Sequence, residues 1–148
     1  MAIGLSLENE PAQQFDLLVL DAFNSDAIPV HLLTQEAFAT YFRHLKPDGA
    51  IVIHLSNREL NLFPVMLGVA KYFQLVLAVI PRNDKTEHWW VRGSVWAILS
   101  HNQKFMYLPP ILAGAEGVLP DLNNPILWTD DYASVFRIIK TRSKPMAR

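Results

Sequence analysis

The first strong pattern in the chain is a short apolar run that ends on an acid. Residues 17–20 are all apolar and Asp21 follows them, which predicts a strand over residues 15–20 that is buried on both faces of a parallel sheet. The carboxyl ends of such strands lie at the ligand crevice of an open α/β sheet. We therefore expect Asp21 to stand at the mouth of a site, with Asp26 returning toward it from the next turn. Two acids there would suit a cationic ligand.

The next segment has helical periodicity. Apolar residues recur at three- and four-residue spacing over residues 37–45, with Thr34 available as the N-cap and Glu36 in the first turn. The Lys-Pro-Asp-Gly sequence at residues 46–49 has turn chemistry and predicts the end of this helix. A second apolar strand is predicted over residues 50–55. A strand, a helix and a strand thus follow one another.

The middle of the chain predicts another helix and two more strands. One apolar face runs through residues 62–72, and Pro64 falls in the first turn, where its missing N–H costs little. Residues 75–80 predict a third strand that stops at Pro81, and residues 95–99 predict a fourth. The connection between these strands is short and polar, so we expect the last two strands to pair antiparallel.

Beyond Ser100 the pattern weakens and reads as loop. Proline, glycine and asparagine interrupt the chain repeatedly, and only residues 133–140 predict a further helix. A basic tail over residues 141–148 is expected to be frayed. The whole order, β-α-β-α-β-β, predicts an open α/β sheet of about four strands with flanking helices and an antiparallel last strand. We expect a single domain with its core over residues 15–140.

The predicted sheet looks like half of a Rossmann-like fold. Nucleotide-binding folds of this type begin with a strand, a glycine-rich turn and a helix, whereas the six glycines of this chain are scattered without a GxGxxG segment. The 14 residues before the first strand are too few for a further βαβ unit of ~30 residues. We therefore expect the N-terminal nucleotide-binding half to be missing, upstream in a longer parent or lost, and we expect no bound cofactor.

Composition narrows the classes of function. The chain has 148 residues, 51% of them hydrophobic, and its 13 basic and 14 acidic residues give a net charge of −1, which offers no broad attraction to nucleic acid. The absence of cysteine excludes thiolate zinc sites and a cysteine nucleophile. The histidines lack metal-ligand spacing, and Ser56 lacks a GxSxG elbow. No apolar stretch approaches ~18 residues and no export signal is visible, so we expect a cytoplasmic chain.

Two segments resemble a known family. The sequence DAFNSDAIPVHLLT at residues 21–34 and the Trp-Thr-Asp-Asp-Tyr sequence at residues 128–132 are similar to spermidine synthase-like proteins, within the class I S-adenosylmethionine-dependent methyltransferase superfamily. The resemblance covers about residues 5–140 and is to the C-terminal half of the domain. Within this family, the two segments are similar to a bacterial branch in which such a domain is often joined to a transporter-like membrane region. This similarity implies a second location for the chain, as the soluble domain of a membrane-anchored parent.

The resemblance implies an aminopropyltransferase ancestry, in which an amine such as putrescine attacks the propyl carbon of decarboxylated S-adenosylmethionine. It implies Asp21 as the base that takes a proton from the attacking ammonium and Asp26 as an anchor for an amine of the substrate. Asp131 and Tyr132 would form the far wall of the amine pocket. His54 is a further candidate contact because it lies near the carboxyl end of a strand. Family members with an assigned activity usually space their two acids as Asp-x-x-Asp, whereas here four residues separate Asp21 from Asp26.

Structural interpretations of the same residues stay open. Asp21 and Asp26 fit turns or caps, Asp131 fits dipole compensation before the predicted helix, and Tyr132 fits a packed aromatic. Three functions are compatible with the sequence: a transferase fragment that is inactive without its nucleotide-binding half, a non-catalytic binding or dimerisation module, and a small-molecule methyltransferase. If no strand precedes it, the strand at residues 15–20 is a free sheet edge, and we expect a homodimer that buries this edge.

Overall fold

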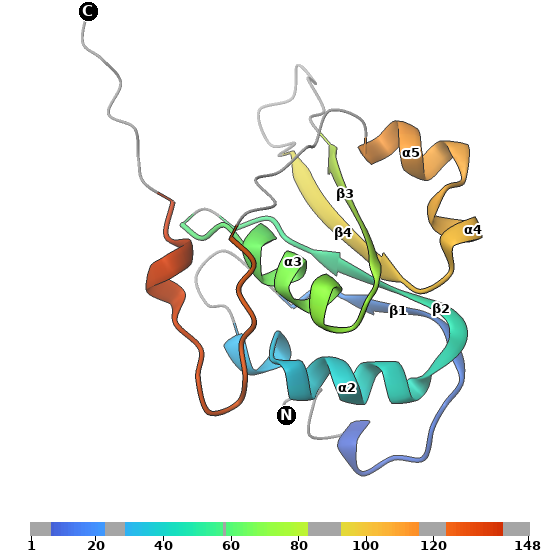
Figure 1. Ribbon diagram of the computed structural model, residues 1–148, viewed down its shortest axis with the longest axis horizontal. Helices are drawn as coiled ribbons and strands as arrows, with labels where there is room; N and C mark the ends of the chain where they lie inside the picture. Colours follow the sequence, from blue (N-terminus) through green and yellow to red (C-terminus); the bar gives the residue numbers. More distant parts are fainter. Residues whose placement is uncertain (1–6, 23–28, 58, 83–92, 116–123, 141–148) are drawn as a thin grey trace, which may run out of the picture.

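An open sheet of four strands with helices packed beside it forms the centre of the computed structural model (Figure 1). The strands are β1 (Phe15–Leu20), β2 (Leu45–His54), β3 (Val76–Arg82) and β4 (Ser94–Ser100). They are arranged in the order β1-β2-β4-β3, with β1 parallel to β2 and β4 antiparallel to both of its neighbours. The structure describes residues 7–22, 29–57, 59–82, 93–115 and 124–140.

The predicted α/β class, the open sheet of four strands and the antiparallel last strand are confirmed, in an arrangement compatible with a partial Rossmann-like fold. The sequence did not indicate where β4 would lie. Besides pairing with β3, it inserts between β3 and β2, so that two strands distant in sequence become neighbours. This insertion decides which side chains meet at the end of β2.

Helix α2 (Gln35–His44) forms where the apolar spacing predicts it. Thr34 caps the helix, since its hydroxyl accepts a hydrogen bond from the Ala37 N–H at 3.3 Å. The side chains of Phe38 and Tyr41 are fully buried. The Tyr41 hydroxyl donates to the carbonyl of Leu32, in the short 3₁₀ turn η1 (Val30–Leu32), and so ties the segment before α2 to the helix.

Strand β2 begins earlier than predicted. The expected turn at residues 46–49 is included in β2, which follows α2 directly at Leu45. Phe15 pairs with Leu45 and Leu17 pairs with Ala50, so the intervening residues of β2 form an irregularity in the ladder. Proline and glycine suit this stretch, because its backbone departs from regular pairing.

Strand β1 is not buried on both faces, and this prediction was wrong. Leu17 and Val19 are 51% and 52% exposed, whereas Leu20 is buried. β1 is the first strand of the sheet order, and no strand among the described residues pairs with its outer edge. One face of β1 therefore carries apolar side chains that are about half exposed.

The main core lies between one face of the sheet and two helices, α2 and α3 (Phe63–Tyr72). Pro64 lies in the first turn of α3, as predicted. Gly68 of the same helix lies against the backbone of Ile126, where a Cβ atom would collide with the Ile126 carbonyl. The helix and the segment that contains Ile126 can approach this closely only because residue 68 has no side chain.

Pro81 does not end the third strand, in contrast to the prediction. It lies within β3 and pairs with Val95 of β4. β3 is an edge strand, so one side of its backbone needs no hydrogen-bond donor, and a proline is tolerated there.

The sequence predicted a loop after Ser100, and this prediction was wrong for the first part of the segment. The structure has two short helices there, α4 (Gln103–Met106) and α5 (Pro109–Ala115). The Asn102 side chain caps α4 by accepting a hydrogen bond from the Phe105 N–H at 3.0 Å. Pro109 and the following proline stand in the first turn of α5, where no intrahelical donor is required. Both helices lie beside β3 (Figure 1).

The helix predicted over residues 133–140 is reduced to a single 3₁₀ turn, η2 (Val135–Ile138). The last residue of this turn and the residues after it are held to the loop after β2. The Asn61 N–H donates to the Ile138 carbonyl and the Lys140 N–H to the Glu59 carbonyl, each at 2.7 Å. These tertiary bonds replace the helical ones. The basic tail lies outside the described residues.

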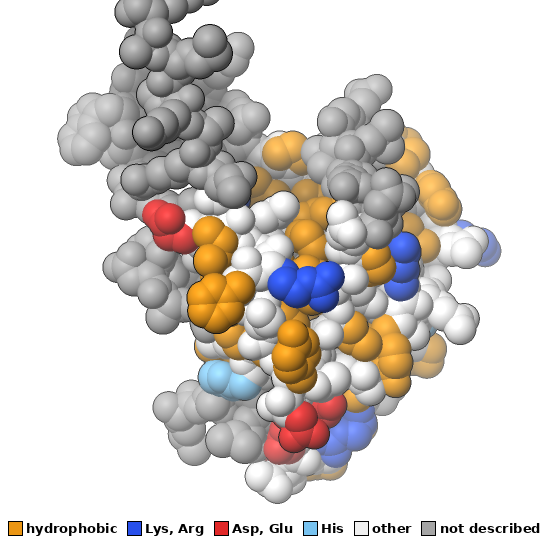
Figure 2. Space-filling view, turned by 60° about the vertical axis from the view of Figure 1, so that its left-hand side comes forward, with side chains coloured by type: hydrophobic (Ala, Val, Ile, Leu, Met, Phe, Trp, Pro, Cys, Tyr) orange, Lys and Arg blue, Asp and Glu red, His pale blue; other side chains and the backbone are white. Residues whose placement is uncertain are grey.

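Charged and apolar side chains are mixed on the molecular surface. Figure 2 shows orange hydrophobic groups on one face with basic and acidic groups between them. No broad area of one charge is visible on that face, in keeping with the net charge of −1. None of the described helices has the length and apolar character needed to cross a membrane.

Candidate functional site

The register of the sheet places three side chains in one row at the carboxyl ends of β1 and β2. His54 pairs with Trp96 of β4, and Asp21 follows directly on Leu20, whose partner is Ile53. Asp21 and His54 are therefore neighbours one step beyond the last β1–β2 pair. Leu20 and Ile53 belong to the core, so the next row points to the opposite face of the sheet.

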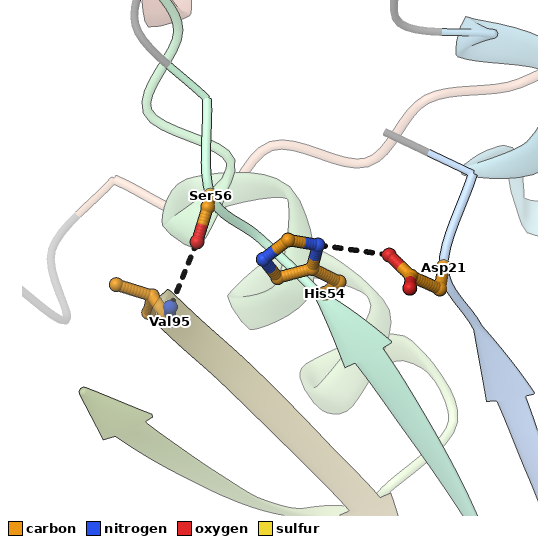
Figure 3. A network of polar contacts seen from close by, with 4 residues as sticks. All are labelled: Asp21, His54, Ser56 and Val95. Atoms are coloured by element: carbon orange, nitrogen blue, oxygen red, sulfur yellow. Dashed lines mark hydrogen bonds and ion pairs between the residues drawn. The ribbon is translucent and has the colours of Figure 1, made fainter. Parts of the chain in front are cut away.

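Asp21 and His54 form an acid–imidazole pair. His54 Nδ1 lies 2.9 Å from Asp21 Oδ1 (Figure 3). A carboxylate can only accept, so Nδ1 carries the hydrogen and donates it. The Asp21 side chain is 63% exposed and that of His54 is 22% exposed. The pair thus presents a carboxylate to solvent and keeps the imidazole behind it.

Trp96 holds the imidazole from the other side. The rings of His54 and Trp96 stack with centroids 4.6 Å apart and an angle of 23° between their planes. Aromatic pairs in such geometry are worth about 0.5–1.5 kcal/mol beyond their buried area. His54 Nε2 is buried and has no hydrogen-bond partner among the described residues. The ring is therefore fixed on one face by stacking and at one nitrogen by the acid.

The chain that leaves His54 is anchored to the start of β4. The Val95 N–H donates to the Ser56 hydroxyl oxygen at 2.8 Å (Figure 3). The Leu55 N–H donates to the Val95 carbonyl at 2.7 Å. Further along, the Asn57 side chain accepts from the Leu60 N–H at 2.8 Å. The sequence around Ser56 lacks the GxSxG elbow of a nucleophilic serine, and in the structure the Ser56 hydroxyl instead accepts a hydrogen bond from the backbone of β4.

The other predicted site residues are not joined to this pair. Asp26 lies outside the described residues. Asp131 and Tyr132 lie in a tight turn that is closed by two backbone hydrogen bonds between Thr129 and Tyr132. In the part of the chain that the structure describes, no hydrogen bond or ion pair links this turn to Asp21 or His54. The predicted helix does not begin at Asp131, so dipole compensation does not explain that residue.

The turn nevertheless lies at the same end of the sheet as Asp21. Thr34 forms a parallel bridge with Trp128, and the Asp130 N–H donates to the Glu36 carboxylate at 3.1 Å. Both contacts are made at the start of α2, by its N-cap Thr34 and by Glu36 in its first turn. Because α2 runs back from the carboxyl end of β1 to the amino end of β2, its first turn lies at the carboxyl end. The Trp-Thr-Asp-Asp-Tyr segment is held there too.

Trp96 is the residue of this site that the sequence did not reveal. Its position in an apolar run predicts only a strand residue. Its contact with His54 depends on β4 lying next to β2, and the sequence showed only that β3 and β4 pair. The alternation of buried and half-buried residues along β4 shows which face Trp96 occupies but not which strand it meets.

No model of a known protein family matches the chain, and no curated protein matches it. Within the described ranges, no group of three or more His, Cys, Asp or Glu residues could hold a metal ion. The chemistry of the candidate site therefore rests on the exposed carboxylate of Asp21 and on its imidazole partner.

Proposed function

We propose that the carboxyl end of β1 binds the ammonium group of a small diamine or polyamine, as the acceptor side of a spermidine synthase-like aminopropyltransferase. The observation that supports this proposal best is the exposed Asp21 carboxylate, held by His54. An ammonium group has three donors and no acceptor, so it complements a carboxylate. A hydrogen bond between two charged groups is roughly twice as strong as a neutral one.

In the transfer reaction the same carboxylate would remove a proton. One N–H bond of the ammonium breaks, its electron pair stays on nitrogen, and the proton moves to a carboxylate oxygen. The free pair then attacks the propyl carbon of decarboxylated S-adenosylmethionine. A C–N bond forms while the C–S bond breaks, and the sulfonium sulfur keeps that electron pair in the neutral thioether methylthioadenosine. The product nitrogen is a secondary ammonium.

The second amine of the substrate needs another acceptor. In this proposal Asp26 anchors it, and Asp131 and Tyr132 form the far wall of the pocket. The bridge between Thr34 and Trp128 supports the assignment of the wall, because it keeps that segment at the carboxyl end of the sheet. A diamine has a positive charge at each end, so two separated acidic groups would select it over a monoamine.

We expect this chain to bind the adenosyl part of decarboxylated S-adenosylmethionine only weakly. The sequence contains no GxGxxG turn, and none of the described helices begins after a glycine-rich turn that could receive the nucleotide. Complete transfer would then require a nucleotide-binding surface supplied by a longer parent or by a second polypeptide.

Calorimetric titration of putrescine and spermidine into the purified chain tests the proposal. Asp21→Asn keeps the shape of the side chain and removes its charge, and we expect it to weaken binding by about 10-fold or more. Asp16→Asn is the matched control, since Asp16 lies on the same strand at its other end. Equal affinity of wild type and Asp21→Asn, or no binding of either amine, would refute the proposal.

A second titration asks whether the site is complete. Methylthioadenosine is titrated into the chain in the presence of saturating putrescine. Micromolar binding would show a complete site and would justify assays of aminopropyl transfer, with Asp21→Asn as the inactive control. Diamine binding without methylthioadenosine binding would define a chain that holds only the acceptor amine.

The exposed edge of β1 favours one other function, that of a dimerisation module. Leu17 and Val19 are half-exposed on an edge strand, and such edges pair readily with other strands. In this proposal two copies pair through antiparallel β1 strands. Light scattering after gel filtration should give the mass of a dimer for the wild type and of a monomer for Val19→Lys, because a lysine blunts a sheet edge. A monomeric wild type would refute this function.

A further inference from the structure

We propose that His54 is a positioning residue for Asp21, which holds Oδ1 so that Oδ2 alone meets the ammonium of the ligand. The identity of the ligand rests on the proposed function, whereas the pairing rests on geometry. Oδ1 lies 2.9 Å from His54 Nδ1, and the Asp21 side chain is 63% exposed. One oxygen is thus committed and the carboxylate still faces solvent.

The alternative, in which His54 itself is the base, fits the geometry less well. A base must reach the proton that it takes, within about 2.6–3.2 Å. Nδ1 carries a hydrogen and donates it to Asp21, so only Nε2 has a free electron pair. Nε2 is buried and makes no hydrogen bond among the described residues. The solvent-facing acceptor of the pair is therefore Asp21.

Two contacts fix the imidazole in different ways. The stack on Trp96 sets the plane of the ring, with 23° between the two planes. A half-turn of the ring about its Cβ–Cγ bond would preserve that stack, but it would place a carbon atom where Nδ1 now meets Asp21. The hydrogen bond to Asp21 therefore selects one of two orientations that the stack allows. An oriented donor in turn fixes the carboxylate, which otherwise rotates freely at the surface.

His44 provides an internal reference for this arrangement. Its Nε2 lies 2.8 Å from the Leu7 carbonyl, which can only accept, and 3.2 Å from Arg43 Nη2, which can only donate. Arg43 Nη2 directs its two hydrogens to the Leu7 and Glu8 carbonyls, at 2.8 and 2.9 Å, so we assign the hydrogen between His44 and Leu7 to Nε2. His44 Nδ1 is buried without a partner among the described residues. The two histidines are thus expected to hold opposite neutral tautomers, with the hydrogen on Nδ1 in His54 and on Nε2 in His44.

Nitrogen NMR of the histidine rings tests the pairing without any ligand. We expect long-range proton–nitrogen spectra, recorded at about pH 8.5 where ordinary histidines are neutral, to show the Nδ1–H tautomer for His54 and the Nε2–H tautomer for His44. Asp21→Ala should abolish the preference of His54 and leave His44 unchanged. His54→Gln assigns the signals. A wild-type His54 in the Nε2–H tautomer would overturn the proposal.

Two variants of His54 separate positioning from packing. His54→Phe keeps a ring to stack on Trp96 and removes the donor, whereas His54→Asn keeps an N–H near the place of Nδ1 and removes the ring. If His54 positions Asp21, His54→Phe should weaken putrescine binding by about 10-fold and His54→Asn by less than about 3-fold. The reverse order would overturn the proposal. If the wild type binds no diamine, the proposed function fails, and the tautomer of His54 then decides the pairing alone.

Discussion

The two ends of the β1–β2 ladder carry similar pairs of groups in different surroundings. At the amino end Asp16 accepts from Lys46 at 2.5 Å, and at the carboxyl end Asp21 accepts from His54 at 2.9 Å. The Lys46 and Asp16 side chains are 42% and 82% exposed, whereas His54 is mostly covered. A flexible lysine in water gives a weak ion pair. A ring held by Trp96 is a rigid donor, and rigidity turns a surface acid into an oriented acceptor.

The two histidines that flank β2 show the same contrast. His44 has no exposed surface, stacks on Phe15 at 6.5 Å and bonds the Leu7 carbonyl. The same carbonyl accepts a second hydrogen bond from Arg43 at 2.8 Å, so this end of β2 ties down the N-terminal segment. His54 instead meets a carboxylate at the edge of solvent. The contacts at the amino end of the ladder are therefore those of a packed core, whereas the carboxyl end is where we propose a ligand contact.

The largest expected difference between the ends is in stability. His44→Ala removes a fully buried ring and one donor to the Leu7 carbonyl, so we expect the free energy of unfolding to fall by about 3 kcal/mol. His54→Ala should lower it by less than half as much, because its ring is partly exposed. Urea unfolding of both variants at pH 8 measures the difference. Equal losses would contradict the division between a structural end and a binding end.

Alkaline pH tests the buried side of α2 in a second way. Burial raises the pKa of Tyr41, which lies one turn before His44, from 10.0 to about 12. The unfolded chain then loses this proton at lower pH than the folded chain, so stability is fully present below pH 10 and falls between pH 10 and 12. We expect a loss of about 2–3 kcal/mol over that range. Tyr41→Phe should show a smaller decline in urea unfolding curves, and an unchanged decline would contradict the assignment.

Those features of the fold that depend on local pattern could be predicted from the sequence. The spacing of apolar residues and the Thr34 cap predicted α2, and the position of Pro64 predicted the start of α3. Features that depend on distant pairing could not be predicted in this way. The tolerance of Pro81 follows from β3 being an edge strand, and the loss of the last helix follows from bonds to the loop after β2. Neither the edge position of β3 nor the contact with the loop after β2 can be recognised from the residues around Pro81 or from those of the last predicted helix.

The same division applies to the candidate site. Asp21 and His54 were predicted separately, because each stands at the carboxyl end of an apolar run, and the structure brings them into contact. Trp96 could not be predicted, since its contact requires β4 to insert beside β2. Asp131 and Tyr132 were predicted by resemblance, and their place in the pocket stays a prediction. A strand end can be recognised in one segment, whereas a stack across the sheet requires the whole topology.

A change at Trp96 should produce an intermediate effect. Trp96→Leu keeps an apolar side chain on β4 and removes the surface on which His54 stacks, so we expect unfolding to become easier by about 1 kcal/mol. Putrescine affinity should fall by a few-fold, because the donor to Asp21 is less well oriented. Trp96→Phe, which preserves a stacking ring, is the matched control. Loss of stability without any loss of affinity would show that Trp96 only packs.

The smallest effect is expected at the exposed pair of the amino end. The hydrogen bond from Lys46 to Asp16, together with the negative charge of Asp16, raises the pKa of Lys46. Any stabilisation from this pair would therefore be present at neutral pH and lost as the pH rises above the ordinary lysine range. Water and salt screen both groups, however, and an exposed pair of this kind contributes little. We expect Lys46→Met to leave the urea midpoint at pH 7, the alkaline decline attributed to Tyr41 and the affinity for putrescine all unchanged. If the loss of stability at alkaline pH disappears in Lys46→Met, the pH sensitivity belongs to the surface pair and not to the buried Tyr41. A weaker affinity for putrescine in Lys46→Met would show that the two ends of the ladder are coupled.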